Sequence, residues 1–286
     1  MSLAVVYSRA QLGVRSPLVN VEVHLSNGLP GLSMVGLPET AVRESKDRVR
    51  SALLNSGFEF PAKRITINLA PADLPKQGGR YDLAIALGIL AASAQIPATP
   101  LDGYEFVAEL ALSGSIRPVQ GILPCAVGAI SDQRQLVCAG ENGAEAALAG
   151  RQRILTADHL LQVCQHLHDH ACLPHATAFA DTTRSAAPDL SEVRGQQQAR
   201  RALEIAASGS HSLLLIGPPG TGKTLLASRL PGLLPELRDQ EALETATVTS
   251  IGRDGFDIAH WKRRPFRAPH HTASAAALAG GGSDPR

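Results

Sequence analysis

The feature that most constrains this chain is the run Gly217–Thr224, which reads GPPGTGKT and has the spacing G-x-x-x-x-G-K-T. Four apolar residues, 213–216, precede it and predict a short buried strand, and residues 225–230 after it predict a helix. A glycine-rich loop between a strand and a helix can aim backbone N–H groups at phosphate oxygens, and the helix dipole favours the negative charge. We therefore expect the chain to bind a nucleoside triphosphate.

Each part of this loop has an expected role in holding ATP and Mg²⁺. The glycines allow a tight turn, the lysine reaches the β- and γ-phosphates, and the last threonine can ligate Mg²⁺ through its hydroxyl. A Gly/Pro turn that only happens to contain Lys-Thr is the alternative, and the flanking strand and helix patterns make it the weaker one. The predicted cofactor-binding residues are Gly217, Pro218, Pro219, Gly220, Thr221, Gly222, Lys223 and Thr224, with Thr224 as the metal ligand and no catalytic residue assigned.

Strand and helix patterns alternate through residues 1–175 and predict a mixed α/β domain. The half-buried strand predicted at 19–25 is expected to pair with 32–35 across the turn at 28–31. The other predicted strands are 65–69, 105–112, 136–139 and 154–155, and the predicted helices are 39–55, 82–94, 122–131, 142–148 and 157–168.

A linker is predicted at residues 176–189, which are poor in large aliphatic side chains, and a second domain at 190–286 that starts with a helix at 199–207. The net charge of +1 gives no global attraction to nucleic acid or membrane. No apolar run is long enough to span a membrane, and the first residues do not read as a signal peptide. The four cysteines form no C-x-x-C pair, so we expect reduced thiols in a cytoplasmic protein without a membrane partner.

Two stretches resemble the active-site region of Lon-type proteases. Residues 71–84 resemble the segment that carries the nucleophilic serine, and residues 112–121 resemble the segment that leads to the catalytic lysine. In this sequence the serine position is Arg80 and the lysine position is about Leu123. A Ser–Lys dyad needs both a nucleophile and a base. We therefore expect a Lon-like fold without proteolysis, and a cryptic peptidase is a minor alternative.

A cluster of cysteines and histidines ends the first domain. Zinc accepts such ligands, but histidines at alternate positions point around a helix rather than to one side, and no second cluster would close the site. A solvated helix end that runs into the linker is the favoured interpretation, and the role of the cluster stays open. Its members are Cys164, His166, His168, His170, Cys172 and His175.

Over nearly its whole length the chain resembles the YifB/ComM family of magnesium-chelatase-like AAA+ ATPases. The resemblance lies in residues 35–45, 71–87, 214–224 and 264–274. It implies a Lon protease-like (ribosomal S5 domain 2-like) N-terminal domain followed by a partial P-loop AAA+ domain. It also implies that the turn at 193–196 lies near the adenine, that the full-length protein forms a hexameric ring, and that this homo-oligomer drives DNA branch migration during natural transformation.

The sequence lacks the second half of an ATPase. Hydrolysis needs an acidic residue at the end of a second apolar strand, the Walker B motif, to hold Mg²⁺. No acid after Thr224 follows a run of four apolar residues, so we expect a truncated copy that binds ATP and does not hydrolyse it alone. Whether the end at Arg286 is natural stays open. These acids are Glu236, Asp239, Glu241, Glu244, Asp254, Asp257 and Asp284.

Residues 261–267 interleave cations with aromatic rings, as a track for single-stranded DNA would. The favoured alternative is an insertion packed against the AAA+ core or a neighbouring subunit, with the arginines in ion pairs. Single-stranded or branched DNA is a possible partner. Two other functions also stay open: a metal-chelatase subunit that inserts Mg²⁺ into a porphyrin, and a non-hydrolysing nucleotide-binding interaction module.

Overall fold

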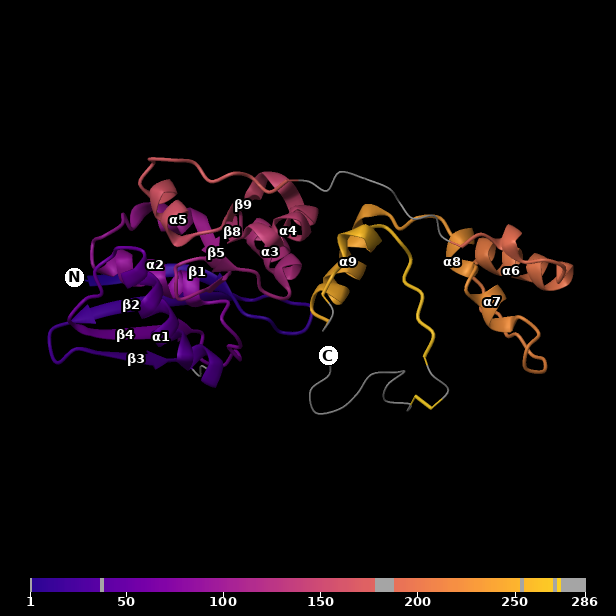
Figure 1. Ribbon diagram of the computed structural model, residues 1–286, viewed down its shortest axis with the longest axis horizontal. Helices are drawn as coiled ribbons and strands as arrows, with labels where there is room; N and C mark the ends of the chain where they lie inside the picture. Colours follow the sequence, from indigo (N-terminus) through magenta and orange to yellow (C-terminus); the bar gives the residue numbers. More distant parts are fainter. Residues whose placement is uncertain (1, 37–38, 178–187, 253–254, 270–271, 274–286) are drawn as a thin grey trace. The chain divides into compact units, whose positions relative to one another are not determined.

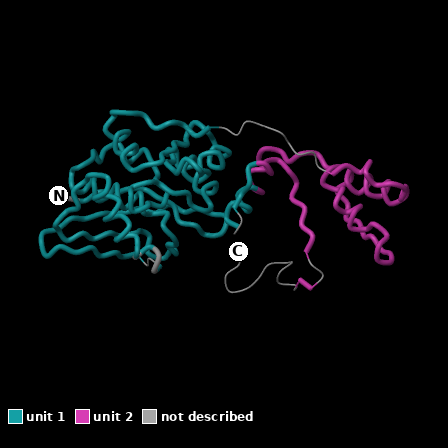
Figure 2. The backbone as a smooth tube through the Cα atoms, viewed as in Figure 1, with its two compact units in different colours: residues 1–179, 246–258, 286 teal, residues 180–245, 259–285 magenta. Residues whose placement is uncertain are grey.

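The computed structural model describes residues 2–36, 39–177, 188–252, 255–269 and 272–273 (Figure 1). The chain forms two compact units (Figure 2). Unit 1 contains residues 1–179, 246–258 and 286, and unit 2 contains residues 180–245 and 259–285. The domain limits predicted at 175 and 190 stay predictions. None of the helices in the described ranges is both long and apolar enough to cross a bilayer.

Unit 1 is built around a mixed sheet of seven strands, and its mixed α/β class agrees with the prediction. Four of the neighbouring pairs are parallel, and β1–β2 and β2–β4 are antiparallel. A separate two-stranded ribbon joins β6 (Glu109–Leu110) to β7 (Ile116–Arg117). In sheet order the seven strands are β3 (Gly31–Val35), β4 (Arg64–Ala70), β2 (Leu18–Ser26), β1 (Ser2–Arg9), β5 (Tyr104–Phe106), β8 (Gln135–Ala139) and β9 (Ile154–Ala157).

The predicted pairing of the first hairpin is wrong. The strand at 32–35 exists as β3, but its neighbour is β4, in a parallel pair that aligns Leu32 with Ile65. Strand β4 in turn separates β3 from β2. The turn at 28–31 permits a hairpin, but pairing is decided by which strands share a buried face, and that is a long-range property. The predicted strand at 105–112 is likewise two short strands, β5 and β6.

Helices α1 (Thr40–Asn55), α2 (Asp82–Ala92), α3 (Ile122–Ser131), α4 (Gly143–Gly150) and α5 (Leu160–Leu167) connect and cover these strands. Helix α2 packs on β1 and β2, whereas α3 contacts β8 and α4 contacts β9. Nearly all of α2 is buried, which fits its continuous apolar sequence. Short 3₁₀ turns lie at η1 (Thr99–Gly103), η2 (Gly140–Asn142) and η3 (Arg151–Arg153).

Two buried carboxylates tie these layers together. Glu105 on β5 is fully buried and accepts two hydrogen bonds from the Arg9 guanidinium on β1, from Nε at 2.6 Å and from Nη2 at 2.7 Å. Asp82 at the start of α2 accepts from Arg48 Nε at 2.8 Å on α1. Such charge-assisted bonds offset part of the desolvation of a carboxylate, and burial still raises the pKa of Asp82. Removing one partner would leave a buried charge without that compensation.

Unit 2 has a small core formed by four buried side chains, those of Leu190, Val193, Leu203 and Leu226. Its residues contribute η4 (Leu190–Glu192), α6 (Gln197–Gly209), α7 (Lys223–Ala227) and α8 (Leu230–Leu233). The remaining elements, α9 (Asp239–Ser250) and η5 (Ile258–His260), include residues of both units. The predicted helix at 225–230 is two short helices, because Pro231 stands in the first turn of α8 and cannot continue α7.

The buried strand predicted at 213–216 is wrong for the described structure. These residues have no regular secondary structure, and the side chains of Leu214 and Ile216 are 80% and 86% exposed. A strand needs a neighbour whose backbone completes its hydrogen bonds. Among the described residues from 188 onward there is no strand that could serve. Only Leu215 is partly buried, against the unit 2 core.

Candidate nucleotide-binding site

The G-x-x-x-x-G-K-T loop turns through two left-handed glycines. The φ angles of Gly220 and Gly222 are +84° and +83°, and α7 begins at Lys223 directly afterwards. A Cβ added at either glycine would meet no atom within 4 Å. The requirement for glycine here is therefore backbone conformation and not space, because L-residues with a side chain rarely adopt this region.

The ammonium group of Lys223 lies against the loop. Its Nζ donates to the carbonyl oxygens of Gly217 and Pro218, at 2.8 and 2.7 Å. The Thr221 hydroxyl donates to the same Pro218 carbonyl at 3.0 Å. These bonds place the positive charge of the lysine over the turn that contains the two glycines. The predicted residues Gly217, Pro218, Thr221 and Lys223 are thus in contact with one another.

The donors that a phosphate would need are available on this loop. Within the described structure, no protein group accepts the backbone N–H groups of residues 220–223. Pro219, Gly220 and Thr224 are exposed, so the Thr224 hydroxyl is accessible. Free N–H groups in a glycine-rich turn, a nearby ammonium group and an accessible hydroxyl are the groups that hold a triphosphate and Mg²⁺. The residues present therefore fit ATP with Mg²⁺.

Contacts from a distant part of unit 2 support the loop. The Gln196 amide donates to the carbonyl of Thr221 at 3.3 Å. Gln196 and Gly195 both have positive φ, +52° and +68°, so the chain turns sharply before α6. Arg229 after α7 donates to Glu192 at 2.7 Å and ties the helix back to η4. The turn at 193–196, singled out by resemblance, thus touches the phosphate loop, but the Arg229–Glu192 bond could not be read from the sequence.

The Lon-like positions hold no nucleophile or base. Arg80 at the serine position is 7% exposed and donates to Gln11 Oε1 at 2.6 Å and to the Gln120 carbonyl at 2.9 Å. Leu123 at the lysine position is fully buried. Arg80 Nη1 also lies 3.8 Å from the Cys125 sulfur, a neighbour that sequence spacing could not reveal. Burial raises the pKa of the Cys125 thiol, although the Arg80 charge opposes this. Arg80 acts here as a buried bridge between loops.

Two of the histidines at 164–175, His166 and His168, make structural hydrogen bonds, whereas Cys172 is exposed. His166 bonds the Tyr104 hydroxyl at 2.9 Å and accepts the Leu173 N–H at 3.2 Å, while the His168 ring lies 3.0 Å from the Cys164 carbonyl. Burial lowers the pKa of His166. Among the residues that the structure describes, no group of three or more His, Cys, Asp or Glu is placed to hold a metal ion.

Part of the basic run at 261–267 is engaged within unit 2. Lys262 Nζ lies 2.5 Å from Asp239 Oδ1, and Arg264 Nε donates to the Pro235 carbonyl at 2.8 Å. By contrast Phe266 is 47% exposed, and Arg267 is also exposed. The packing interpretation therefore fits Lys262 and Arg264, whereas Phe266 and Arg267 are accessible to a ligand.

Comparison with known proteins identifies the family. A model described as "Subunit ChlI of Mg-chelatase" matches residues 21–142, and one described as "Magnesium chelatase, subunit ChlI" matches residues 189–286. The chain is 56% identical to "Competence protein ComM" of Haemophilus influenzae over 291 residues, which cover 100% of this chain and 57% of that protein. It is 54% identical to "Uncharacterized protein YifB" of Escherichia coli over 285 residues, 100% of this chain and 56% of that one.

A shorter match supports the Lon resemblance only locally. Over 65 residues the chain is 40% identical to "Archaeal Lon protease" of Halobacterium salinarum, which is 22% of this chain and 9% of that protein. The chain spans 57% of the length of the ComM relative. The chain belongs to the YifB/ComM family of magnesium-chelatase-like proteins.

Proposed function

We propose that this chain binds ATP with Mg²⁺ at residues 217–224 and is the nucleotide-binding part of an ATP-driven motor that acts on DNA. The single observation that carries the ATP proposal is the loop itself. Two left-handed glycines expose N–H groups that bond no described residue, directly before a helix that begins with Lys223. Family membership supports the same nucleotide and metal.

The residues of the loop would divide the work of binding. The N–H groups of residues 220–223 would donate to phosphate oxygens, and the Lys223 ammonium would exchange the Gly217 and Pro218 carbonyls for the β- and γ-phosphates. The Thr224 hydroxyl would contribute one Mg²⁺ ligand. Bound ATP supplies a phosphoryl group whose transfer releases energy. We propose that residues 1–286 bind ATP without turning it over, since no acid after Thr224 follows an apolar run.

The DNA part of the proposal concerns the full-length protein. It rests on the family resemblance and on the ComM relative, which is named as a competence protein. We propose that the full-length protein assembles as a hexameric ring with a Lon-like, non-proteolytic N-terminal domain and drives branch migration on single-stranded or branched DNA in the cytoplasm. The exposed Phe266 and Arg267 are the residues of the basic run best placed to touch DNA.

ATP binding is tested by titrating the chain with a fluorescent ATP analogue in the presence of Mg²⁺. Charge-assisted hydrogen bonds contribute about 1.5–3 kcal/mol each, so Lys223→Ala should weaken binding roughly 10- to 100-fold. Arg151→Ala is the matched control, because Arg151 is an exposed cation in unit 1, and it should leave the affinity unchanged. Equal affinities of the Lys223→Ala variant and the unmodified chain would refute the site.

A chelatase subunit is the second function to test, because both family models are named for a magnesium chelatase subunit. It would use the same loop and the same nucleotide. ATP hydrolysis by the full-length protein that rises with added porphyrin would favour it. Hydrolysis that rises with added DNA, and not with porphyrin, would favour the DNA motor.

A further inference from the structure

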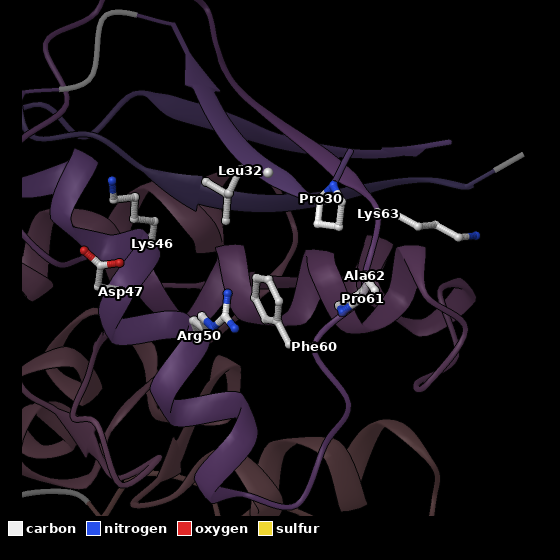
Figure 3. Close-up of a pocket in the computed structure, with 10 residues that line it drawn as sticks. Pro30, Leu32, Lys46, Asp47, Arg50, Phe60, Pro61, Ala62 and Lys63 are labelled. Atoms are coloured by element: carbon white, nitrogen blue, oxygen red, sulfur yellow. The ribbon is translucent and has the colours of Figure 1, made fainter. Parts of the chain in front are cut away.

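Unit 1 has an open pocket that belongs to neither the phosphate loop nor the Lon-like positions (Figure 3). Its volume is about 360 Å³, and it lies between helix α1 and the chain around the edge strand β3. Helix α1 contributes Lys46, Asp47 and Arg50, and the segment before β4 contributes Phe60 and Lys63. Pockets that bind small molecules start at about 300 Å³, so this one has room for a ligand the size of one nucleotide.

The charges around this pocket are unbalanced. Three cations, Lys46, Arg50 and Lys63, line it with a single carboxylate, Asp47. Within the described part of the chain, none of these three cations makes an ion pair with a carboxylate. In Figure 3 the two lysines lie at opposite ends of the pocket, with Arg50 and Phe60 between them. A concave surface with this charge attracts an anion.

The middle of the pocket offers a flat surface. The Arg50 guanidinium carbon lies 5.1 Å from the centre of the Phe60 ring, within the range of a cation–π contact. Phe60 is partly buried and packs against the hydrophobic core of unit 1, which restricts the movement of its ring. A guanidinium plane supported by an aromatic ring is a platform on which a nucleobase can stack.

We propose that this pocket binds one nucleotide unit, whose base stacks on the Arg50–Phe60 pair and whose phosphate pairs with Lys46 or Lys63. A flat base joined to an anionic phosphate matches both halves of the pocket. The same chemistry is present in a free mononucleotide and in a single strand of nucleic acid. Binding of a single strand would rest on the proposed function on DNA, whereas binding of a free mononucleotide would not.

The test measures the fluorescence anisotropy of labelled oligothymidylate and, separately, of a labelled thymidine monophosphate. The double variant Lys46→Ala/Arg50→Ala should weaken binding of the true ligand about tenfold, because stacking and one phosphate contact are lost. With the oligonucleotide, the plot of the logarithm of the binding constant against the logarithm of the salt concentration should also become less steep. Its slope should change by about 0.7 for each lost phosphate contact. Arg151→Ala, an exposed cation outside the pocket, should change neither affinity.

Asp47→Asn is predicted to raise the affinity, and a misfolded variant would lower it. The substitution removes the one carboxylate among the described residues that line the pocket. It should tighten binding about twofold to fivefold, because it removes a repulsion of the order measured for exposed charges. Loss in the double variant and gain in Asp47→Asn, with either probe, would support the proposal and identify its source. Unchanged affinities in both variants, or no binding of either probe by the unmodified chain, would overturn it. Lys223→Ala separates the two sites, because it should weaken ATP binding roughly 10- to 100-fold and leave the affinity of this pocket unchanged.

Discussion

Burial governs the chemistry of the cysteines. Cys125, Cys138 and Cys164 are buried, and Cys172 is exposed. Burial raises the pKa of Cys138 and Cys164 from 9.0 to about 12 in both cases. The thiolate is the reactive form, so a raised pKa and low access both slow reaction. The three buried thiols pack inside unit 1, whereas Cys172 is accessible to reagents.

The raised pKa values predict a loss of stability in alkali. Unfolded, each thiol would lose its proton near pH 9, whereas the folded protein keeps it to about pH 12. The folded state therefore binds more protons in this range, and the stabilisation present below pH 9 is lost as the pH rises toward 12. The free energy of unfolding from urea titration should fall by up to about 1.4 kcal/mol per pH unit for each thiol.

Cys138→Ala should reduce this slope, and Cys172→Ala should leave it as it is, because Cys172 is exposed. At pH 8 the unmodified protein should show one thiol that reacts quickly with a thiol reagent and three that react only after unfolding. Identical alkaline slopes in Cys138→Ala and the unmodified protein would contradict this interpretation.

At the scale of elements, helix α2 is packed tightly on the sheet. A Cβ added at Gly88 would lie 2.6 Å from Val23 Cγ2 on β2, closer than two non-bonded carbon atoms approach without a shift of one of them. In an exposed helix, Gly→Ala stabilises by about 1 kcal/mol. Here Gly88→Ala should do the opposite and cost about 1–3 kcal/mol, the usual range for an overpacked core.

Chemical denaturation of Gly88→Ala measures this cost. Gly103→Ala is the matched control, since no atom lies within 4 Å of its added Cβ, and its effect should stay within about 0.5 kcal/mol. Adding Val23→Ala to Gly88→Ala should recover part of the loss, because the two side chains compete for the same space. A stabilised Gly88→Ala would show that α2 and β2 are not in close contact.

The elements also show what local sequence can and cannot predict. Periodicity alone predicts α1 and α3, because one apolar face is a local property. It missed β1, and it assigned β3 the wrong neighbour, because strand pairing depends on distant residues. The apolar run at 213–216 has the local pattern of a strand, but it forms none, since no described strand pairs with it.

In the candidate site, too, the sequence predicts the local features and not the long-range contacts. The spacing of residues 217–224 predicts the glycine turn and the lysine at the helix start, because these groups are neighbours in the chain. The contact of Gln196 with Thr221, and that of Arg80 with Gln11, join segments far apart in sequence. Tertiary packing decides such contacts, so only the structure could reveal them.

At the scale of the whole molecule, the two units differ in how much they bury. Unit 1 has a seven-stranded sheet and an extensive core, whereas four side chains form the core of unit 2. Regions with few buried apolar contacts open most readily. A ligand that binds only the folded form stabilises it, so ATP should act mainly on unit 2.

Hydrogen–deuterium exchange with and without ATP and Mg²⁺ tests the proposed site most directly. The N–H groups of residues 220–223 make no hydrogen bond within the described structure, and a bound triphosphate would accept them. We predict that ATP slows exchange in a peptide that covers residues 217–228, and that Lys223→Ala requires a higher ATP concentration for the same protection. Equal exchange of this peptide with and without saturating ATP would contradict binding at the loop.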